Sequence, residues 1–126
     1  MHWFSISVAL TAAVAIIAIG VMYLLDPMAV SRSFGLPLAG EGLNFAWWLR
    51  LKGSRDVVSG LVVLALLAWG EPRILGIVLL VMALIPVGDM SVVLAAGGST
   101  RTAFSVHGLA AAVMILGAAP LIIGFG

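Results

Sequence analysis

Apolar residues are grouped into four long stretches, at roughly residues 3–25, 44–69, 74–96 and 102–125. Each stretch is long enough to cross a hydrocarbon core of ~30 Å as a helix that rises ~1.5 Å per residue. The segments between them are rich in Gly, Pro and charged residues, as interfacial loops usually are. The pattern therefore predicts an all-α fold, an integral membrane four-helix transmembrane bundle, with residues 1–126 as a single domain.

The loops refine this picture. The second and third loops, "GEPR" and "GGSTR", are short, so the last three spans are expected to be antiparallel neighbours. Pro72 opens the third span, where proline is favoured. Pro86 should disturb the same span by freeing the carbonyl of Met82, either as a simple packing kink or as the opening of a pocket beside Asp89. The many small residues, among them 15 Gly, predict close packing between helices.

Composition supports a membrane location. Only 9% of the residues are charged, against about a quarter in soluble domains. The absence of cysteine excludes disulfides and thiolate chemistry, and a net charge of +1 gives no reason to expect nucleic acid as a partner. The first span lacks a basic leader and is long for a signal peptide, so we expect it to be retained. The expected location is the inner or plasma membrane of bacterial type, as a multi-pass protein.

Basic residues are unevenly shared between the two ends of the predicted bundle. Arg32 and Arg101 lie in the first and third loops, with Arg50 and Lys52 nearby, whereas the opposite end holds Arg73. The positive-inside rule then favours the first and third loops on the cytoplasmic side.

Three predicted spans carry ionisable residues within the same half of the membrane. Measured from the face that bears loops one and three, Arg50 lies about 9 Å deep and Arg55 and Asp56 roughly 17–18 Å deep, at ~1.5 Å per residue. Asp89 and His107 lie about 10 Å and 8 Å from that face. Antiparallel topology alone does not require this coincidence, so we predict one polar site. Burying such groups is unfavourable unless they are paired or line a wet cavity.

A helical wheel of the second span suggests how its charges are oriented. Lys52, Arg55, Asp56 and Ser59 share one arc, which we expect to face inward and to make this span the central helix. The lipid-facing side is expected to comprise Trp47, Leu51, Val58 and Val62.

Several pairings are open for these charges. Asp89 could form a salt bridge with Arg50 or Arg55. His107 could bond Asp56 or Asp89, and Lys52 could extend to the interface.

These residues suggest a small membrane enzyme that performs acid/base chemistry of the isomerase, cyclase or cofactor-free oxygenase type on a lipophilic substrate. His107 would act as general acid or base, and Asp56 or Asp89 would be its partner. Arg50 and Arg55 would stabilise a developing oxyanion. The predicted substrate-binding residues are Tyr23, Ser59, Trp48 and Met114. One buried His and two buried Asp are too few for a convincing metal site, so we predict neither a metal nor a cofactor.

Two alternatives remain open. The buried charges could instead lock the bundle of a structural, accessory or ligand-binding subunit. They could also serve as a relay in a small transporter or proton conduit, which would have to form a homo-oligomer to provide a through path. The expected partners are the lipid bilayer and a lipophilic small molecule.

The order of motifs resembles a known family. The chain resembles small four-span membrane proteins catalogued as a domain of unknown function. The resemblance rests on the first loop with "FGLP", on "RLKGSRDVVSG" in the second span, on Asp89 late in the third span and on His107 early in the fourth. The resemblance covers nearly the whole chain, implies a four-helix membrane fold and implies no specific activity. The architecture is more distantly similar to DoxX-like and anthrone-oxygenase-like membrane proteins.

Overall fold

The computed structural model describes residues 2–37 and 43–124, which contain helices and no strand. The long helices are α1 (His2–Leu25), α3 (Leu43–Trp69), α4 (Pro72–Met82), α5 (Leu84–Ala95) and α7 (Leu109–Ile123). The shorter ones are α2 (Pro27–Ser31), α6 (Thr100–Thr102) and a π-helical segment, η1 (Ala103–Gly108). The predicted all-α class is confirmed.

Helix boundaries follow from capping residues. Asp26 accepts a hydrogen bond from the Ala29 amide (3.3 Å) and is followed by Pro27, which begins α2. Glu71 caps α4 in the same way, again next to a proline at the first helical position. Ser99 accepts a hydrogen bond from the Thr102 amide and caps α6.

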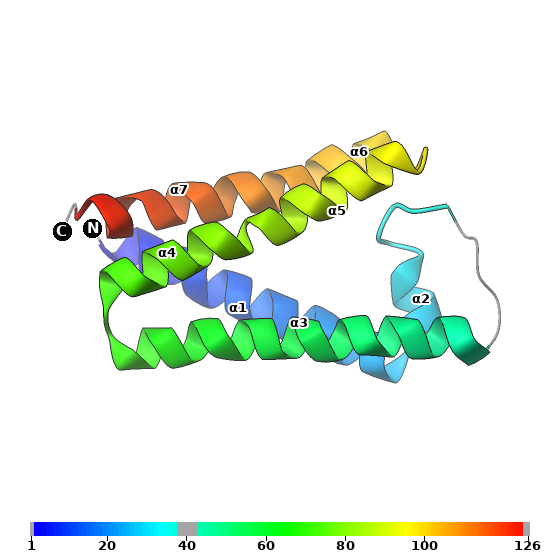
Figure 1. Cartoon of the computed structure of the whole chain (residues 1–126), viewed down its shortest axis with the longest axis horizontal. Coiled ribbons are helices and arrows are strands. Elements are labelled where there is room, and N and C mark those ends of the chain that lie inside the picture. The colour runs from blue at the N-terminus through cyan, green and yellow to red at the C-terminus, as the bar shows by residue number, and fades with distance from the viewer. Residues whose placement is uncertain (1, 38–42, 125–126) are drawn as a thin grey trace.

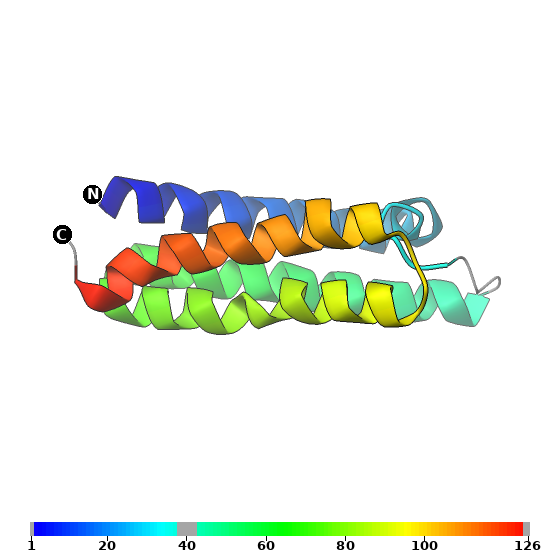
Figure 2. The same ribbon diagram turned by 90° about the horizontal axis from the view of Figure 1, so that it is seen from above.

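The helices form two packed pairs (Figure 1). α1 packs along α3, and α4 packs along α7, while α1 also touches α7. The pairs lie close together at the end that holds the N-terminus and the α3–α4 turn, and they diverge toward the other end, where α2 contacts α1 and α3. Seen from above, the long helices run side by side along the length of the molecule (Figure 2).

The interface between α1 and α3 depends on glycine. A Cβ atom on Gly53 would lie 2.6 Å from the carbonyl oxygen of Gly20, and the reverse distance is also 2.6 Å. Backbone therefore meets backbone at this crossing, as the small residues predicted. The predicted lipid face of α3 is also correct, because Trp47, Leu51, Val58 and Val62 are all exposed. α3 contacts α1, α2 and α4, and α1 contacts α2, α3 and α7. That this span is the central helix stays a prediction.

The third predicted span is interrupted in its middle. α4 ends at Met82, α5 begins at Leu84, and Pro86 follows within the first turn of α5. Proline has no N–H to bond the Met82 carbonyl, so the predicted disturbance is confirmed. Within residues 2–37 and 43–124 of this helical membrane protein, three helical stretches are long and apolar enough to cross a bilayer: 3–25, 72–95 with its interruption, and 100–123. The 27-residue α3 is equally long but carries four charged residues in its first half.

Candidate functional site

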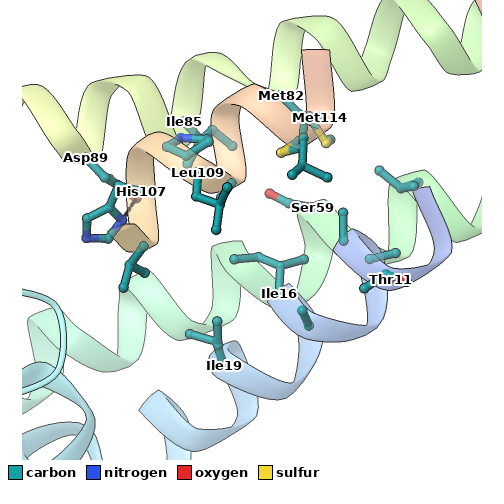
Figure 3. Close-up of a pocket in the computed structure, with 18 of the residues that line it drawn as sticks. Thr11, Ile16, Ile19, Ser59, Met82, Ile85, Asp89, His107, Leu109 and Met114 are labelled. Carbon is teal, nitrogen blue, oxygen red and sulfur yellow. Dashed lines mark ion pairs between the residues drawn. The ribbon is translucent and has the colours of Figure 1, made fainter. Parts of the chain in front are cut away.

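A cavity of about 690 Å³ lies between the two helix pairs. Figure 3 shows Thr11, Ile16 and Ile19 of α1 facing this space together with residues of the opposite pair, among them Met82, Ile85 and Leu109. Its walls are mostly apolar, as in sites that bind small molecules. The charged or titratable lining residues Lys52, Asp89 and His107 come from the halves of their helices that lie near the divergent end.

His107 is the best-positioned acid/base group of this cavity. Its side chain is 9% exposed, and its Nε2 lies 2.8 Å from the carbonyl oxygen of Phe34. A carbonyl oxygen only accepts hydrogen bonds, so Nε2 carries the proton and donates it. In the neutral imidazole this leaves Nδ1 with a free lone pair, 3.9 Å from Asp89 Oδ2 (Figure 3, dashed line). The nitrogen that can accept a proton thus lies beside a carboxylate.

Lys52 and Asp56 form a second charged pair at the same end. Lys52 Nζ lies 2.7 Å from Asp56 Oδ2, one helical turn along α3. The ammonium also lies 4.4 Å from the centre of the Tyr23 ring and 5.2 Å from that of Phe34, so two aromatic faces help to stabilise the charge.

Phe34 links the two charged pairs. Its ring centre is 4.5 Å from that of His107, and its carbonyl holds His107 Nε2. The segment that carries it is fixed on its far side, because the Ser99 amide donates to the Gly35 carbonyl at 2.8 Å. The segment after α2 therefore spans the gap between α3 and the α5–α6 turn and forms one wall of the polar end.

A wider helical turn carries His107. The segment Ala103–Gly108 is π-helical, a local widening that is often found at functional sites. Within it Ala103 and His107 are buried, whereas Ser105 is exposed and bonds the Arg101 carbonyl. No sequence pattern indicated this widening.

Three of the predicted site residues lie away from the cavity. Arg50 donates to the Leu24 carbonyl at 3.2 Å and stacks over Trp47 at 4.8 Å. Arg55 is exposed, and among the described residues neither arginine forms an ion pair with Asp89. Trp48 is 69% exposed and does not line the cavity. The predicted Arg–Asp89 salt bridge is therefore wrong.

Five of the nine predicted site residues do come together, and Asp56 is not among them. Tyr23, Ser59, Asp89, His107 and Met114 all line the cavity, and the predicted approach of His107 to Asp89 is present.

Asp56 was expected to pair with a residue of another helix, but its partner is Lys52 of the same helix, α3. Lys52 was expected to reach the interface and instead forms this pair at the cavity wall. The i, i+4 spacing of Lys52 and Asp56 could have indicated the pair. Nothing in the sequence pointed to the role of Phe34. In residues 2–37 and 43–124, no group of three His, Asp or Glu side chains could hold a metal ion.

Comparison with known proteins identifies the family. The family model described as Domain of unknown function (DUF4267) matches residues 13–121. The chain belongs to this family. The match includes both charged pairs and all or part of every helix that lines the cavity. No curated protein and no solved structure matches the chain. The distant similarity to DoxX-like and anthrone-oxygenase-like proteins stays a prediction.

Proposed function

We propose that this member of the DUF4267 family is a membrane-embedded enzyme that transfers a proton to or from carbon in a lipophilic substrate. The observation that carries the proposal is the His107–Asp89 pair at the polar end of a cavity whose walls are otherwise mostly apolar. Histidine is the side chain that most often transfers protons in enzymes, and here a carboxylate lies 3.9 Å from the nitrogen that would take the proton.

The two groups would have different roles. His107 Nδ1 would take a proton from the substrate and return it at another position. Asp89 would stabilise the imidazolium that exists between these steps, since opposite charges attract strongly in a site of low dielectric constant. The Phe34 carbonyl would keep Nε2 protonated and the ring oriented, so that Nδ1 is always the reacting nitrogen.

Substrate would enter from the bilayer. Ile19 and Met22 of α1 and Leu109 and Val113 of α7 line the cavity and are also exposed on the outside. Such a rim of apolar side chains suits passage of a lipophilic molecule between α1 and α7 and does not suit passage from water. We place the protein in an inner or plasma membrane of bacterial type, with the monomer carrying a complete site.

A ligand-binding or accessory role is the second candidate. The Lys52–Asp56 pair favours it, because the two charges satisfy each other and would hold α3 in place without any chemistry.

An untargeted isotope experiment tests the proposal without knowledge of the substrate. Protein in liposomes made from the source organism's lipid extract is incubated in D₂O, and lipophilic compounds that gain carbon-bound deuterium are identified by mass spectrometry. We expect at least one compound to be labelled by the wild type and at least about 100-fold more slowly by His107→Gln, within the range that general acid/base groups contribute. Asp89→Asn should also slow labelling.

Matched controls come from the same helices. Ser105→Ala and Ser91→Ala change exposed side chains two residues from His107 and Asp89, and should leave labelling unchanged. Native mass spectrometry of wild type and His107→Ala would show whether a non-phospholipid molecule is retained. Equal labelling by wild type and His107→Gln would refute proton transfer by this histidine and leave the accessory role.

A further inference from the structure

Tyr23 presents an unused polar group to the cavity. The residue is 2% exposed and lines the cavity, and no described side chain or carbonyl accepts a hydrogen bond from its hydroxyl. A phenolic O–H can donate to a ligand oxygen.

Lys52 has spare hydrogen-bonding capacity beside Tyr23. An ammonium group has three N–H donors. Within the described ranges its hydrogen-bond acceptor is Asp56, and its Nζ lies over the Tyr23 ring at 4.4 Å. Two N–H groups therefore remain for a ligand. The ammonium and the hydroxyl are hydrogen-bond donors of the polar end, and His107 Nδ1 and Asp89 are its acceptors.

The charges of this end restrict the ligand further. Lys52 and Asp56 neutralise each other, and His107 is neutral as a base, so Asp89 gives the cluster a net negative charge when it is ionised. A permanently anionic head group would be repelled by the Asp89 carboxylate, and a cationic head group would be repelled by the Lys52 ammonium. The favoured ligand has a neutral polar group that becomes negative only when it gives a proton to His107, which then becomes positive. The summed charge of ligand and site is then the same at every step.

We propose that the substrate is a lipophilic unsaturated ketone, or another enolisable carbonyl compound with a carbon–carbon double bond next to its α-carbon, and that the reaction is an isomerisation through its enolate; this rests on the function proposed above. Lys52 and Tyr23 would donate to the carbonyl oxygen, and the adjacent C–H would face His107 Nδ1. The apolar remainder would fill the cavity along α1 and α7. A volume of about 690 Å³ is within the range that accommodates molecules of this kind.

The proposed reaction balances without a co-reactant. His107 Nδ1 takes the proton of the α-carbon, and the C–H electron pair becomes a carbon–carbon double bond. The carbonyl π pair moves onto oxygen, where Lys52 and Tyr23 hold the resulting enolate. Because the substrate carries a carbon–carbon double bond next to the α-carbon, this enolate is a conjugated dienolate. The imidazolium returns its proton to the far carbon of the dienolate, the carbon–carbon double bond moves by one position, the carbonyl re-forms, and His107 is neutral again.

A nitrophenol with an alkyl tail, 4-decyl-2-nitrophenol, is a suitable probe because its phenolate resembles an enolate and absorbs visible light. Below its own pKa, the free probe is neutral and lacks the phenolate band. Wild-type protein should bind it with the phenolate band, since its proton moves to His107. His107→Gln should bind it without the band. Lys52→Met/Asp56→Leu and Tyr23→Phe should each weaken binding about ten-fold or more, in line with the loss of one donor to an oxyanion.

The controls separate this inference from the function on which it rests. Arg55→Met removes an exposed cation from the same helix and should bind the probe like wild type. Decylbenzene, which has no oxygen, should bind equally to wild type and Tyr23→Phe. Two results would show that the carbonyl assignment is wrong, whatever the deuterium experiment shows. The first is that wild type does not bind the probe, or binds it without the phenolate band. The second is that Tyr23→Phe and the Lys52→Met/Asp56→Leu variant bind the probe as tightly as wild type. If the band and its dependence on Lys52 and Tyr23 are present but no compound is labelled in D₂O, the oxyanion site stands as a binding site and the catalytic function fails.

Discussion

Removing Lys52 alone should destabilise the bundle far more than removing it together with Asp56. The two side chains are 31% and 12% exposed, and their charged atoms are 2.7 Å apart. Lys52→Met leaves the buried Asp56 carboxylate without its partner. Breaking a buried ion pair in this way is destabilising by about 3–5 kcal/mol, and the partial exposure of Lys52 places the expected value near the lower limit, at about 3 kcal/mol.

The companion variants define the pair itself. Asp56→Asn leaves the lysine, which keeps both aromatic faces and some access to solvent, so the expected loss is smaller, about 1–2 kcal/mol. Lys52→Met/Asp56→Leu removes both charges and should lie within about 1 kcal/mol of wild type. The expected coupling between the two sites is therefore about 3 kcal/mol.

Unfolding in mixed micelles with increasing SDS fraction, followed by circular dichroism, measures these differences. Arg55→Met is the matched control, an exposed cation three residues away, and should change stability by no more than about 0.5 kcal/mol. If Lys52→Met is as stable as the double variant, Asp56 does not depend on this lysine, and the interpretation of the pair as a unit is refuted.

Two further predictions concern packing and the wall of the polar end. Gly53→Ala should be destabilising by about 1–3 kcal/mol in the same unfolding assay, because its Cβ would lie 2.6 Å from the Gly20 carbonyl oxygen. Gly88→Ala is the control: a Cβ there would have nothing within 4 Å, so the variant should be neutral or slightly stabilising. If both variants have the same effect on stability, α1 can move away from α3 at little cost. Phe34→Ala keeps the backbone carbonyl but removes the ring that lies 4.5 Å from the His107 ring. Deuterium labelling should therefore fall about ten-fold, while affinity for the nitrophenol probe falls less. An equal fall in labelling and in affinity would show that the ring contributes to binding alone.

Sequence reasoning was most successful where one physical constraint dominates. Apolar runs of spanning length correspond to the long helices, and antiparallel connectivity brought Asp89 and His107 to the same end. The lipid face of α3 followed from helical periodicity.

The rest depended on details that no one-dimensional pattern contains. Arg55 and Asp56 are neighbours in the sequence, and successive residues of a helix point about 100° apart. This difference is enough to leave Arg55 exposed while Asp56 is buried. Arg50 was expected at the site, yet its guanidinium finds a free helix-end carbonyl and a tryptophan face closer by. The widened turn before α7 and the backbone carbonyl of Phe34 arise from tertiary packing, so the orientation of His107 could not be predicted.

The divergence of the two helix pairs gives the molecule different cross-sections at its two ends (Figure 1). In a bilayer, the wider end takes up more area in one leaflet than the narrower end does in the other. Lateral pressure among the lipid chains of that leaflet then acts to push α1–α3 and α5–α7 together, which reduces the space at the polar end. We predict that lipids which lower this pressure favour the divergent arrangement of the helix pairs, so that the composition of the surrounding leaflet affects how tightly the cavity binds a ligand.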